Sequence, residues 1–294
     1  RSRRQRQMCI RDRLGSRHLQ GLLKFEKKQL IYVLDPSKNS LNISKERAQE
    51  VENKHKLIYR NNWDELPTEC DLVIVATGAN VRSKIVSKLL IDFKVKNLIL
   101  EKILFQDINS YSEISNLIKK TKTSTWVNHP RRMFNHYQEV KKIISQSEEK
   151  VSFQVYGGNW GLACNGLHFI DLFSFLSNSE VEHINFDGVE EVVDSKRLNN
   201  IEFMGSIKGE FKNGSDFNIS SINGSYADIT VCVFAKSNRW IIQEGTAQKV
   251  IQLSVENNFN ESITTFKNEF QSTLTTRIIN DILNEEKITL PNYD

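Results

Sequence analysis

The chain has 294 residues, enough for about two domains, and no stretch approaches the roughly 18 apolar residues of a membrane span. Apolar residues make up 39% and charged residues 26%, so we expect a soluble protein without a membrane partner. Four widely spaced cysteines without a CxxC pair indicate neither a disulfide framework nor a zinc site, and they favour the cytoplasm. The first thirteen residues hold six arginines and one aspartate, which accounts for the net charge of +4. The remainder is close to neutral, so no nucleic-acid partner is expected.

The arginine-rich start contains the stretch "RRQRQMCIRD". This stretch resembles the translation of a transposase sequencing adapter. We interpret residues 1–13 as an artefactual, disordered segment joined to a truncated gene, with a basic arm as the alternative. On this interpretation the first strand of the following domain is missing.

Helix-like and strand-like segments alternate from residue 14 onward, which predicts a parallel sheet with crossover helices. Four apolar runs of strand length carry this prediction: "QLIYVLD" (29–35), "CDLVIVATG" (70–78), "VKNLILEK" (95–102) and "STWVNHP" (124–130). Amphipathic segments such as "VRSKIVSKLLIDF" separate them.

Beyond residue 128 the pattern changes to strand-length segments joined by polar turns, with "KNGS" (212–215) as a hairpin signal. We therefore expect an α/β protein. A parallel-sheet domain over 14–128 would be followed by an α+β domain over 129–294 with an open, mainly antiparallel sheet.

Gly15 and Asp35 indicate a dinucleotide site at the carboxyl ends of the parallel strands. Gly15 fits the last glycine of a GxGxxG turn, and Asp35 follows twenty residues later at a strand end, where a carboxylate meets a ribose diol. The alternative is a helix cap and an ordinary strand-end acid. Asp35 would repel a 2′-phosphate, so NAD is favoured over NADP, although Ser37 and Lys38 soften this preference.

Four motifs together resemble the Gfo/Idh/MocA oxidoreductases, a family named for glucose–fructose oxidoreductase and inositol dehydrogenase: "GSRHLQGL", "VIVATGANV", "LEK" and "NGLHFIDL". The resemblance covers residues 14–294. It implies a Rossmann domain for the cofactor, followed by a substrate and oligomerisation domain, so a homo-oligomer is expected. It also implies cofactor contacts at Gly15, Ser16, Arg17, Asp35, Ala76, Thr77, Asn80 and Glu101, and it matches His18 to a histidine common in the opening helix.

The resemblance gives Lys102 and His168 catalytic roles. Lys102, after Glu101 but before Ile103 instead of the family's proline, would lower the pKa of a substrate hydroxyl or donate to a developing oxyanion. His168 would take the proton of that hydroxyl as hydride leaves the same carbon. The alternatives are a solvated lysine and a structural histidine.

The family's aspartate, four residues before the histidine, is Cys164 here. The proton relay would then be shortened to Lys102 and His168, or Asn165 would position substrate. Asp171 lies about one turn after His168, where it would orient the imidazole or cap its own helix.

Arg131 and Arg132 lie where the family places an arginine facing the cleft. Either would clamp a carboxylate or phosphate in two hydrogen bonds, with a surface salt bridge as the alternative. A sugar or sugar-derived acid is the expected substrate. No metal site is expected.

Two functions follow. The first is an NAD(P)-dependent oxidoreductase acting on a secondary alcohol or ketone of a sugar-like molecule. The second is a catalytically inactive dinucleotide-binding regulator or scaffold of the same fold. Without its first strand and glycine turn, the chain as given is expected to bind cofactor poorly or not at all.

Overall fold

The computed structural model describes residues 5–9, 12–146, 150–195, 200–284 and 286–293. By its internal contacts the chain divides into two compact units, one of residues 1–130 and 269–294 and the other of residues 131–268. The sequence interpretation assigned all of 129–294 to a second domain. The contacts instead place the last helix with the first unit, because it packs on the opening helix.

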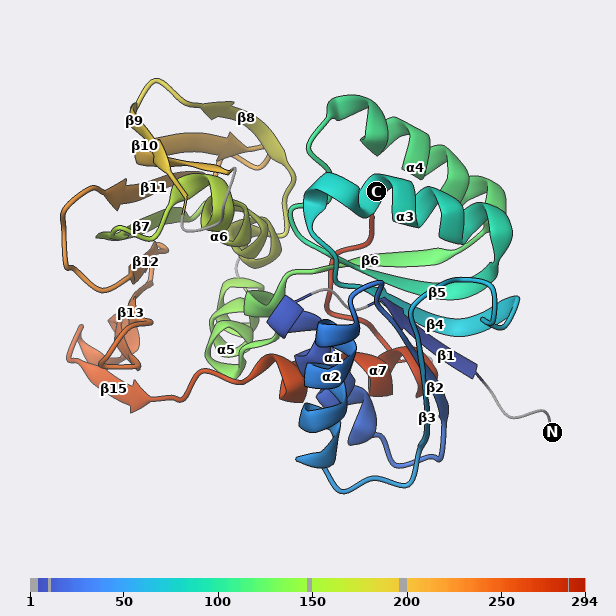
Figure 1. Ribbon diagram of the computed structural model, residues 1–294. Coiled ribbons are helices and arrows are strands. Elements are labelled where there is room, and N and C mark those ends of the chain that lie inside the picture. The colour runs from blue at the N-terminus through green and yellow to red at the C-terminus, as the bar shows by residue number, and fades with distance from the viewer. Residues whose placement is uncertain (1–4, 10–11, 147–149, 196–199, 285, 294) are drawn as a thin grey trace. The chain divides into compact units, whose positions relative to one another are not determined.

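The first unit is a doubly wound α/β fold. Its elements are β1 (Gln5–Cys9), α1 (Asp12–Leu23), β2 (Leu30–Leu34), α2 (Lys38–Gln49), β3 (Lys56–Arg60), β4 (Glu69–Val75), α3 (Ala79–Asp92), β5 (Lys94–Glu101), α4 (Ile108–Thr121), β6 (Ser124–Asn128) and α7 (Gln271–Asn284). The six strands are parallel in the order β3-β2-β1-β4-β5-β6. Helices α3 and α4 lie on one face of the sheet and α1, α2 and α7 on the other (Figure 1).

Strand β1 corrects the expectation that the first strand is missing. Residues 5–9 lie between β2 and β4 and pair with both in parallel. This position completes the backbone hydrogen bonding of two buried strands, a requirement that outweighs side-chain composition. The rest of the predicted artefactual segment includes residues 1–4 and 10–11, which lie outside the described residues.

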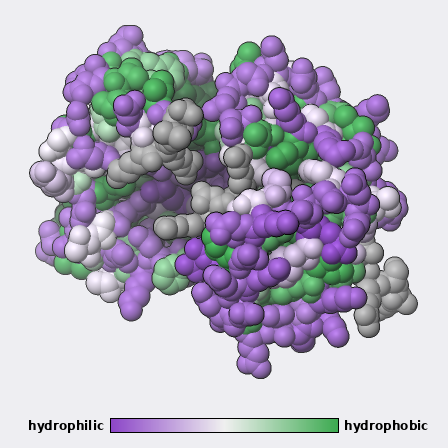
Figure 2. All heavy atoms as spheres, viewed as in Figure 1, coloured by the Kyte–Doolittle hydropathy of each residue, from purple (hydrophilic) through white to green (hydrophobic). Residues whose placement is uncertain are grey.

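The strands of the first unit owe their stability to burial on both sides. Val73, Val75, Leu98 and Leu100 of β4 and β5 are 0% exposed, as expected for parallel strands covered by helices on both faces. Helix α2 has a polar outer surface because most of its residues, KNSLNISKERAQ, are polar or charged, and this helix is largely purple in Figure 2.

The second unit is built on a nine-stranded sheet. Its elements are α5 (Asn135–Ile144), β7 (Ser152–Gly158), α6 (Leu162–Ser177), β8 (Val181–Asn185), β9 (Val189–Asp194), β10 (Ile201–Phe211), β11 (Asp216–Ile222), β12 (Thr230–Phe234), β13 (Asn238–Gln243), β14 (Lys249–Ser254) and β15 (Ser262–Thr265), with short 3₁₀ turns at Pro130–Met133 and Val255–Asn257. Only the β7–β11 pair is parallel among the described strands of this sheet. The predicted mainly antiparallel sheet is confirmed.

Alternation along β7 shows that this sheet is covered on one face. Phe153 and Val155 are buried in the core with residues of α5 and α6, whereas Tyr156 is 52% exposed. The Phe153 ring stacks on Phe173 of α6 with centroids 4.6 Å apart. The "KNGS" turn joins β10 to β11 as predicted, with Gly214 at φ +79°.

Candidate functional site

The predicted cofactor residues of the first unit gather at one edge of its sheet. Asp35 follows β2, Ala76 and Thr77 follow β4, and Lys102 follows β5. Because these strands are parallel, their carboxyl ends share an edge, and the N-terminus of α3 lies at the same edge. Backbone N–H groups of helix N-termini there favour an anionic ligand.

Asp35 is buried, at 1% exposure, at the end of β2. Its Oδ1 accepts the Ser37 N–H at 2.8 Å, and its own N–H donates to the Arg60 carbonyl at 3.1 Å. Ser37 then caps α2 through its hydroxyl, which accepts the Ser40 N–H. The carboxylate is therefore fixed by the turn into α2.

The start of α1 brings together two further predicted residues. Ser16 is buried and its hydroxyl accepts a hydrogen bond from Arg47 of α2. Arg17 is exposed, and its guanidinium donates to Gln20 at 2.8 Å. Gly15 lies inside α1, as the third glycine of a dinucleotide turn does.

A buried arginine joins the loops after β4 and β5. Arg82 of α3 is 2% exposed and donates to the carbonyls of Thr77, Ile103 and Leu104. Sequence analysis missed this residue, because a lone arginine within a helix carries no local signal of burial. In the same loop, Gly78 leaves room for the Asn80 side chain, whose Oδ1 would lie 2.8 Å from a Cβ at position 78.

Glu101, predicted as a cofactor contact, is part of a buried hydrogen-bonded chain. Its Oε1 pairs with His18 Nε2 at 2.8 Å and accepts from Asn128 Nδ2 at 2.5 Å. His18 Nδ1 is 2.8 Å from the Thr275 hydroxyl of α7. Burial raises the pKa of the Glu101 carboxyl, but the hydrogen bond and charge of His18, with Asn128 and Arg82, hold it below its ordinary value.

This network bears on Lys102, the next residue along the chain. An ionised Glu101 accepts hydrogen bonds only, so His18 donates to it from Nε2. The network anchors the carboxyl end of β5, and Lys102, half-buried, begins the loop that follows. Its peptide bond to Ile103 is cis.

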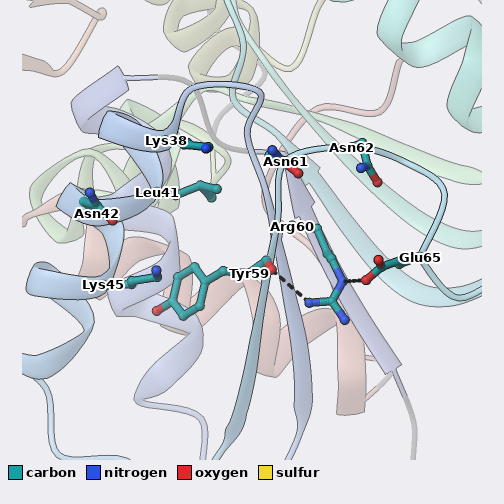
Figure 3. A pocket seen from close by; sticks show the side chains of 9 residues that line it. All are labelled: Lys38, Leu41, Asn42, Lys45, Tyr59, Arg60, Asn61, Asn62 and Glu65. Carbon is teal, nitrogen blue, oxygen red and sulfur yellow. Dashed lines mark hydrogen bonds and ion pairs between the residues drawn. The ribbon is translucent and has the colours of Figure 1, made fainter.

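A cavity of about 450 Å³ lies between α2 and the end of β3 (Figure 3). It is lined by Lys38, Leu41, Asn42, Lys45, Tyr59, Arg60, Asn61, Asn62 and Glu65. Figure 3 shows the Arg60 guanidinium turned toward Glu65, with 2.6 Å between Nε and Oε2. With Arg60 paired to Glu65, Lys38 and Lys45 give the lining of this cavity a net positive charge. Lys38 lies three residues after Asp35 in the sequence.

In the second unit, His168 and Asn165 lie on α6. His168 is buried, at 9% exposure. Asn165 Nδ2 donates to the Trp160 carbonyl at 2.5 Å, and the Cys164 N–H donates to Glu202 of β10 at 2.9 Å. Glu202 was not predicted, because nothing near it in sequence marks it as buried. Lys102 and His168 belong to different units, and their predicted convergence stays a prediction.

Both arginines predicted to clamp substrate are engaged by carboxylates of this chain. Arg131 donates to Glu244 at 3.1 and 2.7 Å, and the Tyr137 hydroxyl donates to the same carboxylate at 2.6 Å. Arg132 binds Asp171 with both distances at 2.7 Å. Asp171, expected to orient His168 or cap its helix, therefore holds Arg132.

The Arg131–Glu244 pair is largely buried, with side-chain exposures of 16% and 7%. Burial raises the pKa of the Glu244 carboxyl, but Arg131 and Tyr137 outweigh it and hold the pKa below its ordinary value. Removing one member of such a pair leaves an uncompensated buried charge.

We expect Arg131→Met to lower the free energy of unfolding by roughly 3–5 kcal/mol, and Glu244→Gln in that background to recover part of it. Lys94→Met breaks the exposed pair with Glu69, 80% and 70% exposed, and should cost under about 1 kcal/mol. Urea unfolding of the four proteins measures these values. An Arg131→Met protein as stable as the parent would contradict the structural role of the pair.

His136 is the titratable group beside this pair. Its ring stacks on Phe266 with centroids 3.9 Å apart. Burial lowers the pKa of His136 to about 4, against an ordinary value of 6.5. Between these two values the unfolded chain binds a proton that the folded one does not.

The contribution of neutral His136 to the free energy of unfolding is therefore expected to be complete above pH 6.5 and to be lost as the pH drops toward 4. His136→Phe keeps the stacked ring and should remove up to about 3 kcal/mol of this dependence. Urea unfolding at pH 7, 6 and 5 compares the two proteins. Equal losses in both would show that His136 does not titrate in this way.

No group of His, Cys, Asp and Glu side chains suited to hold a metal occurs among the residues that the structure describes. Nor does any described helix combine the length and the hydropathy of a membrane span.

Comparison with known proteins agrees with this geometry. Residues 12–129 match the model of the oxidoreductase family with an NAD-binding Rossmann fold, GFO_IDH_MocA. None of the curated proteins matches the chain.

Solved structures share the fold over nearly the whole chain. A UDP-N-acetylglucosamine 3-dehydrogenase from Acidithiobacillus ferrooxidans has a TM-score of 0.73 at 12% identity, covering 97% of this chain and 91% of its own. The transcriptional regulator Gal80p from Kluyveromyces lactis has 0.72 at 13%, covering 96% and 84%. An oxidoreductase from Agrobacterium radiobacter, solved with NAD⁺, L-tartaric acid and magnesium, has 0.72 at 11%, covering 98% and 91%. Residues 12–129 therefore form a domain of the Gfo/Idh/MocA oxidoreductase family, and the whole chain shares its fold with these solved structures.

Proposed function

We propose that this protein is an NAD(P)-dependent oxidoreductase that acts on a secondary alcohol or ketone of a sugar-like substrate. The observation that carries the proposal is the edge of the first unit's sheet, where Asp35, Thr77 and Lys102 follow three parallel strands within the matched family domain. We further propose a cytoplasmic homo-oligomer whose partner is a small molecule and neither a nucleic acid nor a membrane.

The residues present fit a dinucleotide in part. Asp35 is held at the end of β2, where its carboxylate would meet the ribose diol, and α3 begins at the same edge with Asn80 near its start. The pyrophosphate turn departs from the pattern, because its first two glycine positions carry Ile10 and Asp12. A bound nicotinamide would supply the hydride chemistry.

The chain's own contribution is proton handling at the substrate. Lys102 would donate a hydrogen bond to the reacting oxygen, which lowers the pKa of the hydroxyl in oxidation or stabilises the oxyanion in reduction. His168 would accept the hydroxyl proton in oxidation and return it in reduction. The buried Glu101 network holds the strand end from which Lys102 extends.

Cofactor preference follows from charge near the ribose. We expect NADH to bind about tenfold tighter than NADPH, because the Asp35 carboxylate repels a 2′-phosphate, while Lys38 and Lys45 in the adjoining cavity limit the difference. Fluorescence titration with both nucleotides measures it, and Asp35→Ser should shift the preference toward NADPH. Tighter binding of NADPH by the unchanged protein would contradict the assignment.

Turnover tests the proposal directly. Nicotinamide absorbance is followed with a panel of sugars and each of NAD⁺ and NADP⁺. Reduction of either nucleotide by a sugar supports the oxidoreductase. The second candidate, a regulator that binds the dinucleotide without chemistry, is favoured by Cys164 at the family's aspartate position and by the likeness to Gal80p. Nucleotide binding without turnover would select it.

A further inference from the structure

The loop that leads from β7 into α6 is fixed by buried partners. The N–H groups of Trp160 and Gly161 both donate to the Ser221 hydroxyl, at 3.2 and 3.1 Å. Ser221 is fully buried. Gly161 has φ +74°, which favours glycine. This loop sets where the first turn of α6 begins.

Glu202 of β10 lies against that first turn. A Cβ at position 161 would overlap its carboxylate, so the glycine leaves the space that the carboxylate fills. Glu202 is 9% exposed, and Oε1 accepts the Cys164 N–H at 2.9 Å. One helical turn separates Cys164 from His168.

The Glu202 carboxylate has few hydrogen-bond donors around it. Within the described part of the chain it has one hydrogen bond, from Cys164, and no ion pair. A carboxylate has about four acceptor positions, and burying it with a single backbone donor costs stability. Spare acceptor capacity on a largely buried side chain calls for an explanation, and a bound ligand with hydroxyl groups supplies one.

The nearby arginines do not supply the missing charge. Arg131 is bound to Glu244, and Arg132 to Asp171, in paired hydrogen bonds. Each of these two ion pairs is neutral. Among the residues that the structure describes, the start of α6 therefore offers an acceptor for hydroxyl groups, and neither Arg131 nor Arg132 is left to bind a carboxylate or phosphate.

From this balance we propose that Glu202 is a substrate-binding residue and that the protein takes an uncharged polyhydroxylated sugar rather than a sugar acid. The Glu202 carboxylate accepts hydrogen bonds from sugar hydroxyls, beside Asn165 and His168 on α6. A substrate carboxylate at this place is repelled. This inference rests on the proposed function and narrows its substrate class, because the arginine clamp expected from sequence is occupied.

Two matched sugar pairs, glucose with glucuronic acid and galactose with galacturonic acid, test it. Binding of each sugar is read by saturation-transfer NMR, which needs no turnover, and kcat and KM are measured with NAD⁺. The neutral member of a pair is expected to bind and react at least about tenfold better. Glu202→Gln should raise KM for that sugar about tenfold and narrow the difference from the acid, whereas Glu202→Asp restores part of the loss.

Glu210→Gln is the matched control, because Glu210 lies exposed on the same strand. Both variants, Glu210→Gln and Glu202→Gln, should bind the nucleotide with the same dissociation constant as the parent. Preference for the uronic acids, or a Glu202→Gln protein that only loses thermal stability while its sugar binding stays unchanged, would overturn the proposal. Absence of turnover with intact neutral-sugar binding would refute the oxidoreductase and leave the Glu202 assignment standing.

Discussion

Replacing Lys102 with alanine is expected to lower kcat by about 10²–10⁴-fold, because the reacting oxygen would lose the hydrogen-bond donor that we propose Lys102 to be. His168→Ala should lower kcat by a similar factor, since the hydroxyl proton then leaves to water. KM and the NADH dissociation constant should change little, because the proposed mechanism has both groups act mainly in the transition state. Steady-state kinetics with the best sugar of the panel measures both.

The pH profile separates the two roles. His168→Ala should abolish the fall in kcat/KM on the acid side, which reports protonation of a general base in the free enzyme. Lys94→Ala is the control for Lys102, because Lys94 is an exposed lysine at the other end of β5. If Lys102→Ala or His168→Ala keeps a kcat within about tenfold of the parent, the replaced residue has no part in the catalytic step.

The second large effect is expected on NADH affinity when glycine is placed at positions 10 and 12. The combined Ile10→Gly and Asp12→Gly variant is expected to bind NADH at least about tenfold tighter. Asp12 is the first residue of α1, and a negative charge near a helix N-terminus opposes binding of an anionic pyrophosphate. Glycine allows the close backbone approach that such a turn requires.

Isothermal titration with NADH measures this gain. The two single variants divide this gain between positions 10 and 12. Arg13→Gly is the control, because it changes the same turn at a position where the GxGxxG pattern allows any residue. Equal affinity in the double variant and the parent would show that residues 10–15 do not form the pyrophosphate turn. Where the parent's activity is too low to measure, the Lys102 and His168 comparisons are made in the two-glycine background.

The central part of the fold could be predicted from local patterns. Apolar runs such as 70–78 and 95–102 specify strands buried on both faces, and the amphipathic segments between them specify helices. Asn213 and Gly214 specified the β10–β11 turn. Strand β1 was missed, because its sequence QRQMC has no apolar run, and its place is set by the neighbouring strands with which it pairs.

The sequence by itself determined the order of the central strands and helices of the parallel sheet and the positions of Asp35, Lys102 and His168 along the chain, because periodicity and spacing are local properties. Only the tertiary structure decided the partners of the charged groups. His18 meets Thr275 across 257 positions, Arg131 meets Glu244 across 113, and Cys164 meets Glu202 across 38. A hydrogen bond depends on placement within a few tenths of an ångström, and side chains so distant in sequence reach that placement only through packing of the whole unit.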